Sequence, residues 1–313
     1  MITINYLSHN REGLAIYWEI AANFFNKIKP ENKQKIHINV LATGADLNWP
    51  SYLQDISCTV YLFPQSDLNY MEKVYTAIQT SGEYAVKLDE DCFIPNHVWD
   101  YMIENITVLD DDSNLILTPL LSNNIPNTDK FVETFLDSAE SQQIYDCYLN
   151  HRMPDWLWGV NYDSLNKHTI NADTWLPKEY YNSVRQINHY YKGIHPIRVC
   201  AQAHLILNQL ITKHFSRLCD KHDYSIEVMD EPYYTTSAFC IKTQEWRNLL
   251  QCQAVDAFDE VQLNDYRNIT GKKMLRVNNG FSIHTLYNTL YGSIDGGRAY
   301  ELDFVSKLRE LLQ

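Results

Sequence analysis

The stretch that most constrains the fold is residues 83–94, Glu-Tyr-Ala-Val-Lys-Leu-Asp-Glu-Asp-Cys-Phe-Ile. An apolar run from Tyr84 to Leu88, broken only by Lys87, ends in three consecutive acids and then returns at once to apolar residues. Such near-continuous apolar runs are typical of strands covered on both faces in a parallel α/β sheet, and ligands collect at the carboxyl ends of those strands. The stretch therefore predicts a buried strand that delivers acids to the ligand-binding edge of a sheet.

The three acids, Asp89, Glu90 and Asp91, are themselves informative. Adjacent carboxylates repel one another, so a divalent cation or solvent must compensate their charge. Oxygen ligands in an Asp-x-Asp arrangement suit Mg²⁺ or Mn²⁺ held jointly with the phosphates of a substrate. A solvated acidic turn after the strand is the alternative interpretation, and the triplet alone does not decide between the two.

Strand-like and helix-like patterns alternate around this stretch. Strands are expected at 2–7, 35–41, 58–63 and 84–88, and helices at 14–25 and 67–80. This alternation implies right-handed crossovers and a parallel sheet, so the loops after the first, second and fourth strands should open on one edge. The expected fold class is therefore α/β.

The rest of the chain is less regular. Further strands are expected at 115–121, which contains Pro119, and at 234–241, and further helices at 95–105, 198–218, 244–251 and 299–312. The last of these is amphipathic. We expect it to pack on the body of the protein, with a homodimer contact or peripheral contact with a membrane surface as alternatives.

Composition limits the class of protein. Apolar residues at 45% and charged residues at 21% are typical of an ordinary globular chain;. The net charge of −13 would repel a phosphate backbone, so nucleic acid is a disfavoured partner;. The seven cysteines form no Cys-x-x-Cys pair and are expected to be reduced thiols;. With no signal-like start and no apolar stretch long enough to span a bilayer, the expected location is cytoplasmic.

The acid-terminated strand resembles the signature strand of GT-A glycosyltransferases, and in particular of the family-two type, in which an apolar strand ends in Asp-x-Asp. A second motif of that family recurs here with its spacing. An acid pair is followed by a Leu three residues after its second acid, by a Gly eleven residues after that acid, and by a His thirteen residues after the Gly: Asp259-Glu260, Leu263, Gly271 and His284.

The resemblance covers residues 1–121 and 233–285. The chain departs from the family in two places: the acid pair is Asp-Glu where the family usually has Glu-Asp, and Asp256-Ala257 stands where Gly-Gly is common. The resemblance implies a GT-A fold: a Rossmann-like nucleotide-binding sheet, an acceptor-binding part and a largely helical insertion.

The resemblance also implies roles for particular residues. Asp89, Asp91 and His284 would hold Mn²⁺ or Mg²⁺, with Asp89 also contacting the donor. Glu260 would be the catalytic base, with Asp259 holding acceptor hydroxyls. The remaining contacts to the nucleotide would come from the loops after the first two strands: Ser8, Asn10, Arg11 and Asp46.

Simpler interpretations stay open for several of these residues. Glu90 is expected to be a bystander, solvated or at the sheet edge. His284 could be a core or surface histidine, and Arg11 could form a surface ion pair. The acid pair Asp259-Glu260 could stabilise the first turn of a helix.

The expected division of the chain is a nucleotide-sugar-binding half at 1–121, a largely helical insertion or acceptor region at 122–232, an acceptor and catalytic part at 233–285, and a C-terminal helix at 286–313. The expected activity is that of a metal-dependent, inverting glycosyltransferase of the hexosyltransferase type. It would move a sugar from a nucleotide-sugar donor, with a UDP-sugar favoured, to a hydroxyl of a glycan or other acceptor. The alternatives are a sugar-1-phosphate nucleotidyltransferase, a non-catalytic nucleotide-sugar or carbohydrate-binding protein, and an enzyme that glycosylates DNA.

Overall fold

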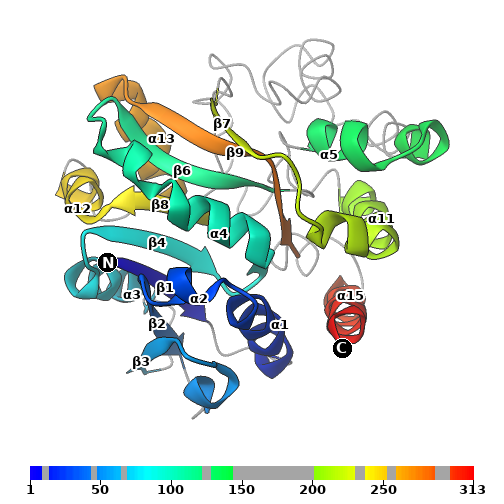
Figure 1. The fold of residues 1–313 in the computed structure, drawn as a ribbon, viewed down its shortest axis with the longest axis horizontal. Helices are drawn as coiled ribbons and strands as arrows, with labels where there is room; N and C mark the ends of the chain where they lie inside the picture. Colours follow the sequence, from blue (N-terminus) through cyan, green and yellow to red (C-terminus); the bar gives the residue numbers. More distant parts are fainter. Residues whose placement is uncertain are drawn as a thin grey trace, which may run out of the picture.

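The computed structural model describes residues 1–8, 14–43, 48–64, 69–121, 128–143, 201–229, 237–251, 259–285 and 297–313. The predicted sites Asn10, Arg11 and Asp46 lie outside these residues. The described strands form a nine-stranded sheet in the order β3-β2-β1-β4-β8-β6-β9-β5, and β7 also pairs with β9 (Figure 1). The strands are β1 Ile2–Ser8, β2 Ile36–Thr43, β3 Ser57–Phe63, β4 Tyr84–Asp89, β5 Cys92–Phe93, β6 Asn114–Leu121, β7 Ser225–Val228, β8 Ala238–Lys242 and β9 Lys273–His284.

The described helices include counterparts of the six that the sequence predicts, and others that it does not. The α-helices are α1 Leu14–Asn26, α2 Pro30–Lys33, α3 Asn69–Thr80, α4 Asn96–Glu104, α5 Thr128–Phe135, α11 Ala201–Cys219, α12 Thr243–Gln251, α13 Asp259–Thr270 and α15 Gly297–Leu312, and two 3₁₀ helices are η1 Trp49–Tyr52 and η2 Ile106–Asp110. None of the helices within the described ranges is long and apolar enough to cross a membrane.

Strand direction confirms the predicted α/β class. β1 pairs in parallel with β2 and β4, and β2 pairs in parallel with β3. β8 is antiparallel to both of its neighbours, β4 and β6, so β6 runs in the same direction as β4. β9 is parallel to β6. The carboxyl ends of β1, β2, β4, β6 and β9 therefore open on the same edge of the sheet.

Pro119 lies inside β6 without breaking it. A proline has no N–H to donate, so it cannot continue a regular ladder. The register between β6 and β9 shifts at this point, because Thr118 pairs with Arg276 whereas Leu120 pairs with Phe281. In the extra residues of β9, Asn279 has a φ of 61°, a left-handed conformation that asparagine tolerates better than most residues;. The bulge lets the predicted strand continue past its proline.

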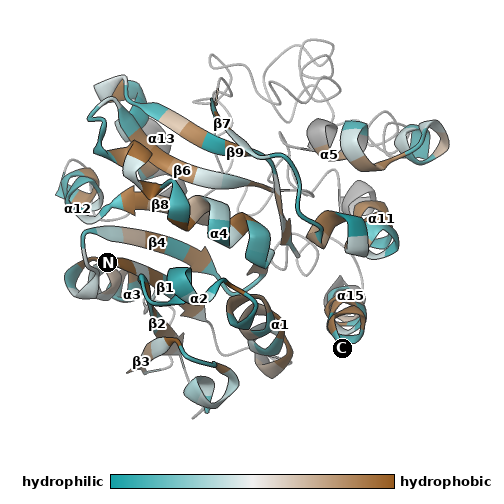
Figure 2. Cartoon of the chain, in the orientation of Figure 1, coloured by the Kyte–Doolittle hydropathy of each residue, from teal (hydrophilic) through white to brown (hydrophobic). Residues whose placement is uncertain are grey.

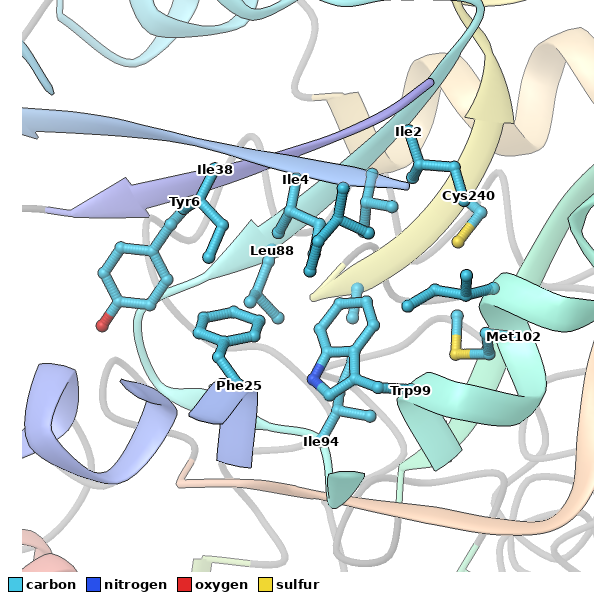
Figure 3. Close-up of a cluster of buried hydrophobic side chains, with 14 of the residues drawn as sticks. Ile2, Ile4, Tyr6, Phe25, Ile38, Leu88, Ile94, Trp99, Met102 and Cys240 are labelled. Atoms are coloured by element: carbon cyan, nitrogen blue, oxygen red, sulfur yellow. The ribbon is translucent and has the colours of Figure 1, made fainter. Parts of the chain in front are cut away.

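Helices cover both faces of the sheet. On one face, α1 and α4 pack against the inward side chains of β1, β2, β4 and β8. Figure 3 shows part of this cluster, in which Phe25 and Trp99 face Ile4, Ile38 and Leu88. On the other face, α3, α12 and α13 pack against the same strands and β6. Hydrophobic residues gather on the central strands, whereas α12 is mostly hydrophilic (Figure 2). Burial on both faces explains why the sequence of β4 is almost uninterrupted in its apolar character.

A third apolar cluster joins the C-terminal helix to the body. Tyr17, Ile20 and Phe24 on α1 pack with Phe304, Val305 and Leu308 on α15, together with residues of α5, α11 and β9. In Figure 1, α1, α11 and α15 lie on the same side of the molecule. The prediction that the amphipathic C-terminal helix packs on the body is confirmed. Within residues 122–232, α5 and α11 are helical, whereas β7 joins the main sheet through β9.

Glu140 connects a helical turn over residues 138–143 to α11. Its carboxylate accepts hydrogen bonds from Lys213 Nζ (2.5 Å) and the Asp137 backbone N–H (3.1 Å), and lies 3.0 Å from His214 Nε2. Burial alone would raise the pKa of Glu140, but its hydrogen bonds with Lys213, Asp137 and His214 outweigh burial and lower the pKa to about 2;. The ionised form of Glu140 therefore stabilises the folded chain.

We expect this stabilisation to be lost in acid. Because the pKa of Glu140 is lowered on folding, its contribution is fully present above its ordinary value of 4.5 and disappears as the pH falls toward about 2;. Urea denaturation should show Glu140→Gln to be less stable than wild type at pH 6, with the difference shrinking toward pH 3. Glu133→Gln, which changes an exposed acid of α5, is the control. A difference that stays constant from pH 6 to pH 3 would contradict the prediction.

Candidate functional site

Three of the predicted donor-site residues lie at the ends of strands. Ser8 ends β1, Asp89 ends β4 and His284 ends β9. Backbone hydrogen bonds continue the sheet past these ends: the Asp89 N–H donates to the Ser237 carbonyl (2.9 Å) and the Glu90 N–H to the Leu7 carbonyl (3.1 Å). The acid triplet is therefore fixed to strands on both sides of β4.

The short strand β5 explains how Asp91 reaches His284. β5 pairs antiparallel with the end of β9, with Cys92 opposite His284. The Thr285 N–H donates to the Asp91 carbonyl at 2.8 Å. Asp91 Oδ1 then lies 3.3 Å from His284 Nε2, and both side chains are largely buried. The structure thus brings together two of the three predicted metal ligands, far apart in the sequence.

The environment of His284 favours its protonated form. Burial lowers the pKa of the imidazole, but the negative charge of Asp91, a hydrogen bond with Asp91 and the charge of Asp89 outweigh burial and raise the pKa above its ordinary value;. Ser237 Oγ lies 3.3 Å from the same Nε2 atom. His284 is therefore part of an acidic, hydrogen-bonded site, which favours the functional interpretation of this residue over that of an isolated core histidine.

Asp89 has a different partner. Lys87 Nζ lies 2.8 Å from Asp89 Oδ1 and 2.9 Å from Oδ2. The two residues project to the same face of β4 because side chains alternate along a strand. Only 2% of the Lys87 side chain is exposed, against 28% for Asp89, so a buried cation holds the carboxylate at the rim of the site. The lysine that interrupts the apolar strand is thus the counter-ion of the first acid.

Of the two settings expected for Glu90, solvated or at the sheet edge, the structure excludes the solvated one. Glu90 is 2% exposed, and its Oε2 accepts a hydrogen bond from Ser8 Oγ at 3.1 Å. Lys73 of α3, fully buried, donates from Nζ to the Ser8 carbonyl at 2.5 Å. Glu90 therefore helps to fix the end of β1. The burial of Glu90 and of Asp91, which is 7% exposed, also contradicts the interpretation of the triplet as a solvated turn.

The acid pair of the second motif begins a helix. Asp259 and Glu260 are the first two residues of α13, and only their backbone belongs to the described part of the chain. The helix ends at Thr270, and Gly271 follows with a φ of +68° and donates its N–H to the Arg267 carbonyl at 2.9 Å. The glycine of the spaced motif is therefore a helix C-cap, a position that favours residues without a Cβ.

Sequence reasoning missed three residues of the site. Lys87 was visible as the one charge within an apolar strand, and burial of such a charge requires a partner;. Lys73 has no comparable signal because it lies in a helix of mixed composition. Ser237 precedes β8, and its place depends on β8 running antiparallel between β4 and β6.

The donor atoms fit a divalent cation in part. Asp91 offers a carboxylate oxygen, which suits Mg²⁺ or Mn²⁺, and His284 offers an imidazole nitrogen, which is typical of Zn²⁺, Cu²⁺, Fe²⁺ or Ni²⁺ sites. Within the described ranges, no group of three or more His, Cys, Asp or Glu residues is arranged to hold a metal ion. A cation held by this pair would take its other ligands from water and from substrate phosphates, as Mg²⁺ sites commonly do.

Comparisons with known proteins give distant structural matches. No protein-family model and no curated protein matches the sequence. Solved structures with a similar arrangement include the mannosyltransferase PcManGT from Pyrobaculum calidifontis in complex with GDP-Man and Mn²⁺, at 11% identity and a TM-score of 0.42 over 90% of this chain and 56% of that one. This chain thus spans little more than half of the length of that protein.

Two other matches cover more of their own chains. Mouse xyloside xylosyltransferase 1 matches at 10% identity and a TM-score of 0.31, over 96% of this chain and 83% of that one. S. aureus TarS 1-349 matches at 13% identity and a TM-score of 0.31, over 98% of this chain and 90% of that one. These are distant likenesses in the arrangement of sheet and helices. The functional interpretation therefore rests on the residues at the sheet edge.

Proposed function

We propose that this chain is a metal-dependent glycosyltransferase that moves a sugar from a nucleotide-sugar donor, a UDP-sugar being favoured, to a hydroxyl of a glycan or other acceptor. The observation that carries the proposal is the Asp91–His284 pair, whose Oδ1 and Nε2 atoms lie 3.3 Å apart where β4 and β9 end. Asp89 and Ser8, at the ends of β4 and β1, belong to the same edge. Ligands of open α/β sheets bind at that edge.

The chemistry explains why acids and a histidine are needed there. A diphosphate leaving group gains negative charge as the glycosidic bond breaks, and a divalent cation such as Mn²⁺ or Mg²⁺ neutralises that charge. Asp91 and His284 would hold the cation. Asp89, oriented by the Lys87 ammonium group at 2.8 Å, would accept hydrogen bonds from the donor's ribose or complete the cation's ligands through water;.

The remaining assignments extend the proposal to the acceptor. Glu260 would remove the proton of the attacking hydroxyl, in an inverting reaction, and Asp259 would hold the acceptor. Asn10, Arg11 and Asp46 would contact the base and phosphates of the nucleotide. Residues 1–121 would then form the donor half, residues 122–232 an acceptor region and residues 233–285 the catalytic part.

Isothermal titration tests the donor site. The protein is titrated with UDP, GDP and CDP, each with Mn²⁺ and with EDTA, and we expect one nucleotide to bind with the metal and to lose its affinity in EDTA. Binding of no nucleotide under either condition would overturn the proposal. Binding that is unchanged in EDTA would leave a nucleotide site and remove the metal from the proposal.

A second assay separates the two enzyme classes. A glycosyltransferase releases UDP from a UDP-sugar, whereas a sugar-1-phosphate nucleotidyltransferase releases pyrophosphate from UTP and a sugar 1-phosphate. We expect UDP release alone, from at least one member of a panel of UDP-sugars. Pyrophosphate release would assign the same sheet edge to nucleotidyl transfer.

A further inference from the structure

A buried acid outside the candidate site contacts the strand end that carries His284. Glu301 of α15 is fully buried, and its Oε1 accepts hydrogen bonds from Tyr17 OH at 2.6 Å and from Thr285 Oγ1 at 2.7 Å. Tyr17 lies on α1 and is 2% exposed, and Thr285 directly follows β9 and is fully buried. Glu301 therefore ties the C-terminal helix to both α1 and the end of β9.

Thr285 links this acid to the candidate site. Its side chain donates to Glu301, while its backbone N–H donates to the Asp91 carbonyl at 2.8 Å. Because Thr285 is bonded covalently to His284, one residue is held between the buried acid on one side and the Asp91–His284 pair on the other. A shift of Thr285 would change the position of the His284 ring relative to Asp91.

Packing alone does not account for an acid at this position. Phe304, Val305 and Leu308 already pack α15 against Ile20 and Phe24 of α1. A buried carboxyl group loses its hydration, and an apolar side chain of similar volume is often as stable or more so. What the carboxyl group adds is directional acceptance from two hydroxyl groups, which fixes positions to a degree that apolar contact does not.

We propose that Glu301 is a positioning residue of the donor site: through Thr285 it holds the end of β9 so that His284 and Asp91 face one another. The part of this inference that concerns a cation rests on the proposed function. The part that concerns the position of the His284 ring does not. Outer-sphere residues that orient a metal ligand typically account for 10–100-fold in metal affinity.

The test compares Glu301→Leu, which removes the acceptor, with Glu301→Gln, which keeps an acceptor oxygen. Two measurements are made: the ring ¹⁵N chemical shifts of His284 in the metal-free protein, assigned as the signals that are missing from His284→Gln, and the Mn²⁺ affinity by electron paramagnetic resonance. We expect Glu301→Leu to move the His284 signals and to weaken Mn²⁺ binding about 10-fold. Glu301→Gln should restore both measurements toward wild type.

Three further variants give the inference its controls. Thr285→Val removes only the linking hydroxyl and should reproduce the effect of Glu301→Leu. If the Glu301→Leu protein does not fold, Thr285→Val is the variant that tests the inference. Tyr17→Phe removes the hydrogen bond from Tyr17 OH to Glu301 and should leave the His284 signals close to wild type. Asp303→Asn changes an acid on the same helix whose side chain is 62% exposed and pairs with Lys307, and it should change neither measurement.

Each outcome separates this inference from the proposed function. His284 signals that stay at wild-type positions in both Glu301→Leu and Thr285→Val would overturn the inference, even if both variants were less stable. Wild-type protein that binds no Mn²⁺ would contradict the metal site, while moved His284 signals in the same variants would still support the positioning role of Glu301.

Discussion

Replacing Asp91 by Asn is expected to abolish metal-dependent nucleotide binding. The substitution keeps the shape of the side chain and removes its charge, so His284 loses the carboxylate that lies 3.3 Å from its Nε2 atom. Loss of an outer-sphere partner commonly costs 10–100-fold in metal affinity, so we expect loss of a direct ligand to cost about 100-fold or more. Titration with Mn²⁺, and then with the nucleotide that binds the wild type, measures both steps.

The matched control is Asp110→Asn. Asp110 accepts a hydrogen bond from Tyr84 OH at 2.7 Å and pairs with Lys242 at 3.0 Å, so it lies by the amino end of β4, at the opposite edge of the sheet. We expect the Asp110→Asn protein to bind Mn²⁺ and nucleotide with affinities within about twofold of wild type. Charges farther apart than the Debye length of about 10 Å are largely screened. Asp91→Asn protein that binds nucleotide and Mn²⁺ as wild type does would remove Asp91 from the donor site.

Replacing Trp18 by Ala is expected to lower the free energy of unfolding by several kcal/mol. Trp18 is 1% exposed, and its ring lies edge-on to Tyr6, with centroids 5.0 Å apart, and to Trp49, with centroids 4.7 Å apart. Its Nε1 also donates to the Trp49 carbonyl at 3.0 Å. Removing a buried tryptophan leaves a cavity and typically costs about 3–5 kcal/mol. Urea denaturation gives the change in the free energy of unfolding.

Two variants bracket this prediction. Trp18→Phe keeps an aromatic ring but loses the Nε1–H and part of the volume, so it should cost less than Trp18→Ala, about 1–2 kcal/mol. Ile269→Ala truncates a side chain that is 74% exposed and should change the free energy of unfolding by no more than about 0.5 kcal/mol;. A loss of less than about 1 kcal/mol for Trp18→Ala would show that α1 does not depend on this aromatic contact.

Local pattern was enough to locate most elements. The apolar run from Tyr84 to Leu88 predicted a strand covered on both faces, and it forms β4 in the middle of the sheet. Helical spacing predicted α3 and α12 to within a few residues. These features are local: side-chain period and flanking residues decide whether a segment forms a strand or a helix, and both can be read along the chain.

Part of the site could also be predicted from the sequence. The position of the acids at the end of a strand follows from where the apolar run stops, and the parallel alternation of the first half brings the ends of β1 and β4 to one edge. The spaced motif identified His284 as a candidate metal contact together with Asp89 and Asp91. Its pairing with Asp91 depends on β5 running antiparallel to β9.

Tertiary structure alone decided the partners of Glu90 and Asp91. The sequence by itself determined that a buried strand ends in Asp89, Glu90 and Asp91. It could not determine that Glu90 is buried with its carboxylate accepting from Ser8, or that β5 brings Asp91 to within 3.3 Å of His284. The physical reason is that a buried carboxylate is stable only beside a hydrogen-bond donor or a cation. Which group lies beside it depends on contacts between segments that are distant in the sequence.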